Sequence, residues 1–191
     1  MISRIEHNYY REIVKERLCQ CDILHNVSIA TASDFNIETG KYSITEYYLN
    51  YGIVINQECD LEHDFKCRNN PTALNQDKVL PNILILPAYL SEDFRNGTHR
   101  EKGLIGNRWD TTLFKQIRNN NHPRFHFILK DEDFQLPELV VDFKHVYSLK
   151  TEIAYKLVDR LYYLSISELF REDLSHRYSY YLSRIGLPVI N

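Results

Sequence analysis

An apolar segment that leads directly into a polar cluster limits the folds open to this chain more than any other stretch. Residues 52–64 are GIVINQECDLEHD, in which Ile53, Val54 and Ile55 form a continuous apolar run. Such a run is typical of a β-strand that is covered on both faces. We expect the strand to end at Gln57, so that the polar residues lie at a sheet edge. Polar chemistry often gathers at strand ends, which makes this segment the first candidate site.

Other apolar and β-branched segments alternate with turn residues along most of the chain. Residues 37–41, IETGK, have the composition of a turn. Most connections lack the full crossover helix that parallel strands require. We therefore expect an α+β fold with a mainly antiparallel sheet. The predicted strands are residues 22–32, one or two strands within 43–57, 83–86 closed by Pro87, 124–129, 139–149 and 160–165.

Helices are predicted where apolar residues recur every three to four positions or where capping residues occur. The C-terminal helix, residues 166–185, has the clearest pattern, because Ser165 and Glu168 have the spacing of a capping box. Ser91 is predicted to cap a short helix. Residues 62–78 are polar and indicate a loop. The other predicted helices are residues 3–18, 91–97, 110–117 and 150–158.

Length and charge narrow the classes of protein to which the chain can belong. Its 191 residues fit a single domain, 1–191, with a core at about 22–165 followed by the C-terminal helix. The net charge of -3 gives no overall attraction for nucleic acid, so RNA or DNA would need a local basic patch. Candidates for such a patch are Arg171, Arg177 and Arg184, or the loop at 99–108.

The chain shows no sequence signal for membrane insertion or secretion. No apolar run approaches the roughly 20 residues of a membrane-spanning helix. The charged N-terminus lacks the apolar region of a signal peptide. We therefore expect a cytoplasmic protein without membrane contact. In that compartment the cysteines should be thiols rather than disulfides. They are Cys19, Cys21, Cys59 and Cys67.

Metal and cofactor motifs are weak or lacking in the sequence. A zinc site would combine the four cysteines with His25 and His63, but their spacings differ from those of structural zinc sites. The favoured alternative is unpaired buried thiols. The chain has no Walker A, GxGxxG, HExxH or GxSxG pattern. We therefore predict no metal and no cofactor.

Cys59 is also a candidate nucleophile. A thiol needs a nearby base to become reactive, and the candidate bases are His63, His126 and His145. His63 is four residues away, but beyond a strand end this spacing fixes no geometry. This hypothesis therefore depends on how the chain folds.

Asp142 lies inside the apolar run LVVDF, where a carboxylate must face solvent or have a partner. We favour a buried ion pair that ties the sheet to the last helix, with Arg177 or Arg184 as the partner. A carboxylate metal site for a nuclease is the alternative, in which Asp142 and His145 would join the acidic residues of the 60–64 cluster. Alternation in a strand would place Asp142 and His145 on opposite faces, which weakens that alternative.

Two patches of the chain resemble segments of a known group of bacterial proteins. The patches are the strand that ends in Q-x-C-D-L at residues 57–61 and the helix that ends in R-x-G-L-P at residues 184–188. This group resembles the SH3-like barrels of MazF/PemK-type toxins, which implies an SH3-like β-barrel with inserted helices. Those toxins are ribonucleases with an arginine before the apolar run. Here Tyr51 and Gly52 occupy that position, so the catalytic arginine is not carried over.

Three functions are compatible with these features. The first is a binding or accessory module in a phage-defence or toxin–antitoxin setting, which would recognise RNA, DNA or a protein. The second is a divergent nuclease that uses Asp60, His63 or Arg177, with Cys59 as a further catalytic candidate. The third is a structural protein in which Cys59 and Asp60 only pack the barrel. The residues predicted to bind are Gln57, Cys59, Asp60, Arg177 and Arg184.

Overall fold

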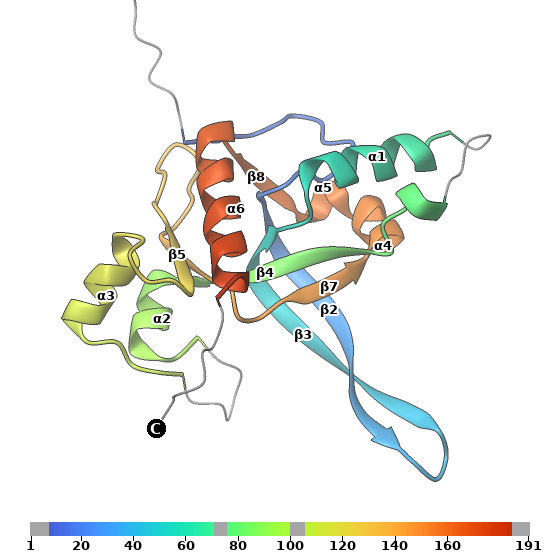
Figure 1. Ribbon diagram of the computed structural model, residues 1–191, viewed down its shortest axis with the longest axis horizontal. Coiled ribbons are helices and arrows are strands. Elements are labelled where there is room, and N and C mark those ends of the chain that lie inside the picture. The colour runs from blue at the N-terminus through green and yellow to red at the C-terminus, as the bar shows by residue number, and fades with distance from the viewer. Residues whose placement is uncertain (1–7, 71–75, 100–105, 185–191) are drawn as a thin grey trace, which may run out of the picture.

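The computed structural model describes residues 8–70, 76–99 and 106–184. Within them, eight strands form one antiparallel sheet that curls into a half-barrel (Figure 1). The strand order is β1-β8-β2-β3-β4-β6-β5, and β7 pairs with β4. The expected α+β fold with a mainly antiparallel sheet is confirmed. The strands are β1 (Tyr9–Tyr10), β2 (Asp22–Asn36), β3 (Lys41–Val54), β4 (Asn82–Leu90), β5 (Phe125–Ile128), β6 (Leu139–Asp142), β7 (Tyr147–Lys150) and β8 (Tyr162–Ile166).

The two longest strands, β2 and β3, form a hairpin whose outer half leaves the body of the molecule (Figure 1). Gly40, with φ +66°, supplies the left-handed conformation at the predicted turn. The inner halves pair with β8 and β4, but the outer halves pair only with each other. We call residues 30–48 the arm. The sequence predicted both strands but not that they extend beyond the body.

Strand β4 continues through Pro87, although the sequence predicted that proline to end it. Residues 82–85 of β4 pair with β7, and residues 88–90 pair with β6. On this edge of β4, Pro87 lies between the residues that pair with β7 and those that pair with β6. Its missing N–H therefore removes no hydrogen bond to either strand. The predicted strand at 139–149 is accordingly two strands, one for each half of β4.

Six α-helices and one 3-10 turn complete the described fold. The predicted helices at 91–97, 110–117, 150–158 and 166–185 are confirmed with small changes of boundary. The helix predicted at 3–18 is wrong where the chain is described: residues 8–18 are not helical, and Tyr9 and Tyr10 pair with β8. Residues 3–7 of that prediction lie outside the described residues. The polar segment after Gln57 is a helix rather than a loop. The helices are α1 (Glu58–Arg68), η1 (Gln76–Lys78), α2 (Ser91–Asn96), α3 (Thr111–Arg118), α4 (Thr151–Lys156), α5 (Val158–Leu161) and α6 (Glu168–Leu182).

Two predicted helix caps are wrong. Ser91 is the buried first residue of α2, and Leu90 occupies the N-cap position. Helix α6 begins after Ser167 without a side-chain cap, because Ser165 lies in β8 and donates its hydroxyl to Asp22 instead. By contrast, Asp110 caps α3 and accepts hydrogen bonds from two backbone N–H groups of the first turn.

The helices cover the sheet in three hydrophobic clusters. Helix α6 packs Leu174, with Tyr178 and Tyr181, against the strands that form the centre of the sheet. Leu61 of α1 joins α4 and α5 in the second cluster. Helices α2 and α3 cover the third cluster, near β5 and β6. None of the described helices is long and apolar enough to cross a membrane.

Candidate functional site

The polar cluster at 57–64 lies on a helix and not at a strand end. Gln57 is the extended N-cap of α1, and the helix follows directly. Glu58 and Asp60 stabilise its first turn, because acidic side chains interact favourably with the positive end of the helix dipole. Leu61, Asp64 and Cys67 are its buried residues. The three-residue spacing of these buried side chains is typical of a helix, but the many polar residues around them gave the segment the composition of a loop.

The first turn of α1 and the outer surface of α6 line one groove of about 520 Å³. Gln57 and Cys59 contribute from the predicted motif, and His176 contributes from α6. The structure therefore brings together two segments that are far apart in the sequence. The other residues that line the groove are Gln20, Ile55, Glu58, Ser175, Tyr178, Ser179 and Leu182.

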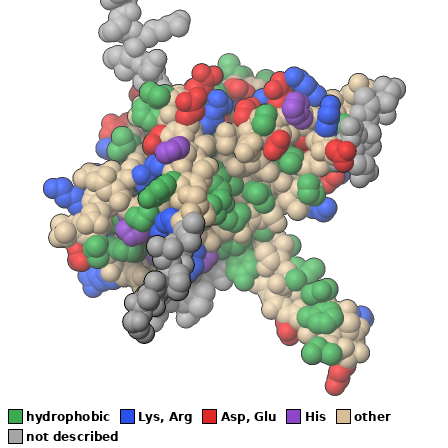
Figure 2. All heavy atoms as spheres, viewed as in Figure 1, with side chains coloured by type: hydrophobic (Ala, Val, Ile, Leu, Met, Phe, Trp, Pro, Cys, Tyr) green, Lys and Arg blue, Asp and Glu red, His purple; other side chains and the backbone are tan. Residues whose placement is uncertain are grey.

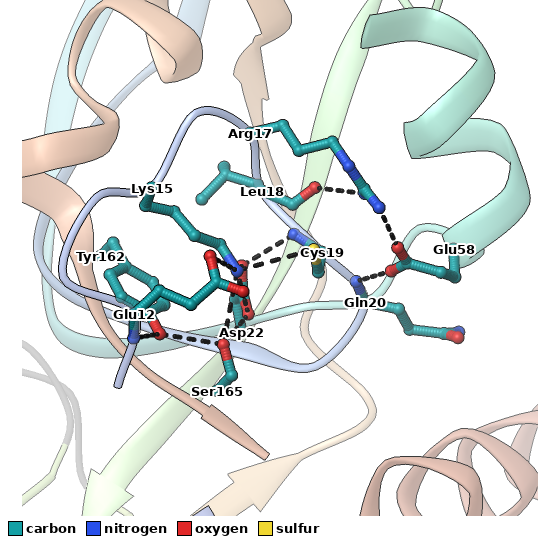
Figure 3. Close-up of polar contacts among 10 residues, drawn as sticks. All are labelled: Glu12, Lys15, Arg17, Leu18, Cys19, Gln20, Asp22, Glu58, Tyr162 and Ser165. Atoms are coloured by element: carbon teal, nitrogen blue, oxygen red, sulfur yellow. Dashed lines mark hydrogen bonds and ion pairs between the residues drawn. The ribbon is translucent and has the colours of Figure 1, made fainter. Parts of the chain in front are cut away.

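Glu58 fastens this wall of the groove to the segment before β2. Its carboxylate accepts hydrogen bonds from Arg17 at 2.6 Å and from the backbone N–H of Gln20 at 2.7 Å (Figure 3). Burial opposes ionisation, but these hydrogen bonds outweigh it and lower the pKa of Glu58. The opposite wall is held by Cys21, whose Sγ lies 3.6 Å from the hydroxyl of Ser175.

Cys59 is exposed, and its Sγ lies 3.8 Å from side-chain oxygens of both Gln57 and Asp60. His63 is exposed on the same helix. The other predicted bases lie elsewhere, since His126 is buried in β5 and His145 lies 3.6 Å from Asp142. His176 instead shares the groove with Cys59. No local sequence pattern connects these two residues.

The predicted pair Arg177 and Arg184 does not form one basic surface. Arg177 donates to the carbonyl oxygens of His122 at 3.1 Å and Phe125 at 2.9 Å, and also to that of Asn120. Arg184 is exposed and donates to a backbone oxygen of its own helix. The guanidinium of Arg177 therefore anchors α6 to the segment around β5.

Asp142 forms the expected buried ion pair, but the predicted partners on α6 are wrong. Its carboxylate accepts two hydrogen bonds from Arg124, at 2.8 and 2.7 Å. Arg124 directly precedes β5, which pairs with β6, so the tie lies within the sheet. The strand ends at Asp142 and the chain turns, which brings His145 to within 3.6 Å. The expectation that these two side chains face opposite ways is therefore also wrong.

A second buried ion pair, which no sequence pattern predicted, joins Lys15 and Asp22 (Figure 3). Asp22 accepts hydrogen bonds at 2.7 Å from both the backbone N–H of Cys19 and the hydroxyl of Ser165, and Lys15 lies 3.3 Å away. Burial raises the pKa of Asp22 to about 6. Burial would lower the pKa of Lys15, but the neighbouring acidic groups, with Asp22 first among them, together outweigh it and raise that pKa. The only sequence signal was an acidic residue at the start of an apolar strand.

The described residues contain no group of three or more His, Cys, Asp or Glu side chains that could hold a metal ion. None of the four cysteines, all of which lie in the described residues, forms a disulfide; Cys19 and Cys21 lie just before β2, and Cys59 and Cys67 lie in α1. With this geometry established, comparisons with protein-family models, curated proteins and solved structures return no match.

Proposed function

We propose that this protein is a binding module that recognises its partner in the groove between α1 and α6. One observation carries the proposal. Gln57 and Cys59 of the Q-x-C-D-L motif line the same groove as five residues of α6, the helix that precedes the R-x-G-L-P segment, of which residues 185–188 lie outside the described part of the chain. The curled antiparallel sheet is compatible with an SH3-like barrel of the MazF/PemK type. On this basis the setting we propose is bacterial and cytoplasmic, in phage defence or a toxin–antitoxin system.

The chemistry of the groove favours a polypeptide as the partner. Its described lining offers amides, hydroxyls, a thiol and an imidazole, together with two apolar side chains. Glu58 is the one carboxylate in that lining, and Arg17 already pairs with it. None of the described lining residues is Lys or Arg. Binding to a nucleic-acid backbone relies on such cations, whereas a peptide needs hydrogen bonds and small apolar contacts.

The nuclease alternative has no comparable support. A nuclease would require its candidate residues Asp60, His63 and Arg177 to lie together in one site. Asp60 and His63 point from the exposed surface of α1, whereas Arg177 is held by three backbone oxygens. The structural alternative requires Cys59 and Asp60 to be packed inside the fold, but both are exposed.

A binding measurement with matched variants on α6 tests the proposal. The probes are the purified product of the adjacent gene and short RNA and DNA oligonucleotides, followed by calorimetry. Ser179→Trp would fill the groove, and Glu172→Trp, on the same helix but outside the lining, is the control. We expect the protein probe to bind, and Ser179→Trp to weaken it about tenfold or more, which is about 1.4 kcal/mol.

Three results would contradict the proposal. The first is that the adjacent gene product does not bind. The second is that it binds equally well to Ser179→Trp and to the wild type. The third is that an oligonucleotide binds in the groove, shown by loss of its binding in Ser179→Trp alone, since this would replace the polypeptide by a nucleic acid.

A further inference from the structure

A second hollow, of about 550 Å³, lies at the base of the arm and is lined mainly by aromatic rings. The curl of the sheet brings β7 against β2 here, and the end of β4 and the residues before β7 complete the lining (Figure 1). Its volume lies within the range of small-molecule sites. The described linings of this hollow and of the groove between α1 and α6 share no residue. The hollow is lined by Thr31, Tyr47, Tyr48, Leu49, Tyr89, His99, Lys144, His145, Val146 and Tyr147.

Two pairs of rings form the walls of the hollow. Tyr47 and Tyr147 lie with their ring centroids 6.0 Å apart, and Tyr147 packs against the second hydrophobic cluster. The ring centroids of Tyr89 and His99 are 4.7 Å apart, and both rings lie beside the buried Phe94 of the third cluster. All four wall rings are half-buried. A ring that a core holds on one side and that is open on the other offers a preformed face for stacking.

The charges around the hollow favour an anionic ligand. Lys144 is exposed, and it is the only Lys, Arg, Asp or Glu in the described lining. Asp142 lies 3.6 Å from His145, but this carboxylate is fully buried and accepts two hydrogen bonds from Arg124. Its negative charge is therefore already compensated. An ammonium group such as that of Lys144 binds phosphate as a point charge.

We propose that the hollow binds a free nucleotide, with its base against the tyrosine rings and its phosphate beside Lys144. This inference goes beyond the proposed function, because it concerns a small molecule and a different part of the surface. A base presents a flat π-face that stacks on aromatic side chains, and a phosphate presents negative charge to a cation. The hollow combines both kinds of group. A neutral sugar would use the rings but not the lysine.

The adjoining surface indicates at which end the phosphate lies. A smaller hollow of about 240 Å³ continues past Tyr89 and His99, which line both, and its lining includes Asp93. A phosphate at that end would meet a carboxylate, whereas at the opposite end it meets Lys144. The base therefore lies towards Tyr89 and the phosphate towards the residues before β7.

The charge of the arm favours a free nucleotide over a nucleic-acid strand. The arm has a net charge of -2, from one basic and three acidic residues: Lys41, Asp34, Glu38 and Glu46. Figure 2 shows acidic side chains (red) towards the free end of the arm. A strand that continued along the arm would need further cations for its phosphates, and these acidic groups would repel it. A single nucleotide needs only Lys144.

Binding of nucleotides and of their parts to the full chain tests the proposal. The probes are AMP, GMP, CMP and UMP, followed by NMR titration, which also detects weak binding. The matching nucleoside and ribose 5-phosphate separate the contribution of the base from that of the phosphate. We expect at least one nucleotide to bind, and each of its two parts to bind about tenfold more weakly or less, because each part makes only one of the two contacts.

Two substitutions, each with a matched control, assign the two contacts. Lys144→Met should weaken binding of the nucleotide about tenfold and leave the nucleoside unchanged, since only the phosphate loses its partner. Lys150→Met removes an exposed lysine outside the lining and should change neither. Tyr47→Leu should weaken both ligands, because both stack through the base. Tyr42→Leu, on the same strand but outside the lining, should weaken neither. Circular dichroism checks that the variants are folded.

Failure of every nucleotide to bind would overturn the inference. So would a control substitution that weakens binding as much as the substitution to which it is matched. A single-stranded RNA hexamer of the same base should bind no more tightly than the nucleotide, and a hexamer that binds more than about tenfold more tightly would replace the free nucleotide by a strand. Ser179→Trp, in the groove between α1 and α6, should leave nucleotide binding unchanged, so this result is separate from binding of the adjacent gene product.

Discussion

At the scale of single residues, ionisable groups buried with their partners hold distant segments together. Asp22 joins the segment before β2 to β8 through Lys15 and Ser165. Asp142 joins β6 to the residue before β5 through Arg124. Removing one member of such a pair leaves the other charged in a poorly solvated place, which costs more than the pair contributes.

Lys15→Met should therefore destabilise the fold strongly. Lys15 opposes the burial that raises the pKa of Asp22 to about 6, so in the variant the buried carboxyl loses its cation and its pKa rises further. We expect a loss of about 3–5 kcal/mol in the free energy of unfolding, measured with urea. Lys66→Met, which removes an exposed lysine, is the control. The double variant Lys15→Met/Asp22→Asn should recover part of the loss. A double variant as unstable as Lys15→Met would show that charge is not the cause.

His126 should make the protein less stable in acid. Burial, reinforced by the charge of Arg177, lowers the pKa of His126 to about 3. In the unfolded chain a histidine binds a proton below about pH 6.5, while the folded protein stays neutral there. Stability therefore falls as the pH drops from about 6.5 towards 3. Between pH 8 and pH 5 this costs about 2 kcal/mol.

His126→Phe removes this titration. When the pH falls from 8 to 5, the variant should lose about 2 kcal/mol less of its unfolding free energy than the wild type loses. Asp22 has the opposite dependence, since its raised pKa costs stability as the pH rises from about 4 to 6. That contribution is the same in both proteins and cancels in the comparison. Parallel pH profiles would rule out a neutral buried His126.

At the scale of elements, the sheet edge at β5 is closed by side chains rather than by another strand. Asn120 accepts a hydrogen bond from the N–H of Phe127 at 2.6 Å and donates to its carbonyl at 3.2 Å. Arg177 reaches across from α6 to the carbonyl of Phe125. Occupied edge groups are not available to pair with another chain, so α6 protects this edge as well as covering the core.

Arg177→Met should loosen this edge. The change removes the donor for three backbone oxygens, and we expect a loss of about 2–4 kcal/mol in the free energy of unfolding. Hydrogen exchange should become faster in residues 120–128. Arg184→Met on the same helix is the matched control and should change little, because that side chain is exposed. Equal effects of the two variants would contradict the anchoring role of Arg177.

At the scale of the whole molecule, the fold buries the four cysteines to different extents. Cys21 and Cys67 are buried, Cys19 is half-buried and Cys59 is exposed. Burial raises the pKa of the Cys19 thiol to about 11 and that of Cys21 to about 12. A thiol reacts as the thiolate, so both burial and the raised pKa slow these two groups.

A thiol count in native protein should therefore give one rapid reaction. With an aromatic disulfide reagent at pH 8, we expect Cys59 to react at once and the other three cysteines to react only as the protein opens. All four should react in denaturant. Cys59→Ser should remove the rapid phase. Two or more rapid thiols in the wild type would contradict the burial of the others.

Local patterns in the sequence were enough to predict much of the secondary structure. The apolar run Ile53–Ile55 predicted a strand, the turn at 37–41 predicted its hairpin, and the periodicity before Arg184 predicted α6. Such features depend on near neighbours, through alternation, turn conformation and the spacing of apolar residues. Local patterns failed where a distant partner decided the conformation. Tyr9 and Tyr10 pair with β8 instead of forming a helix, and Pro87 lies in a strand whose two halves have different partners.

The candidate site depended almost entirely on contacts between distant segments. The sequence identified Gln57 and Cys59, but their neighbour His176, the pairing of Asp142 with Arg124 and the burial of Lys15 with Asp22 appear only in the folded chain. The partners of a charged group are set by which strands pair and how helices pack on them, and one residue of register moves a side chain to the opposite face. For that reason local patterns in the sequence predicted the antiparallel architecture, whereas the groove and the ion pairs arise from packing between distant segments.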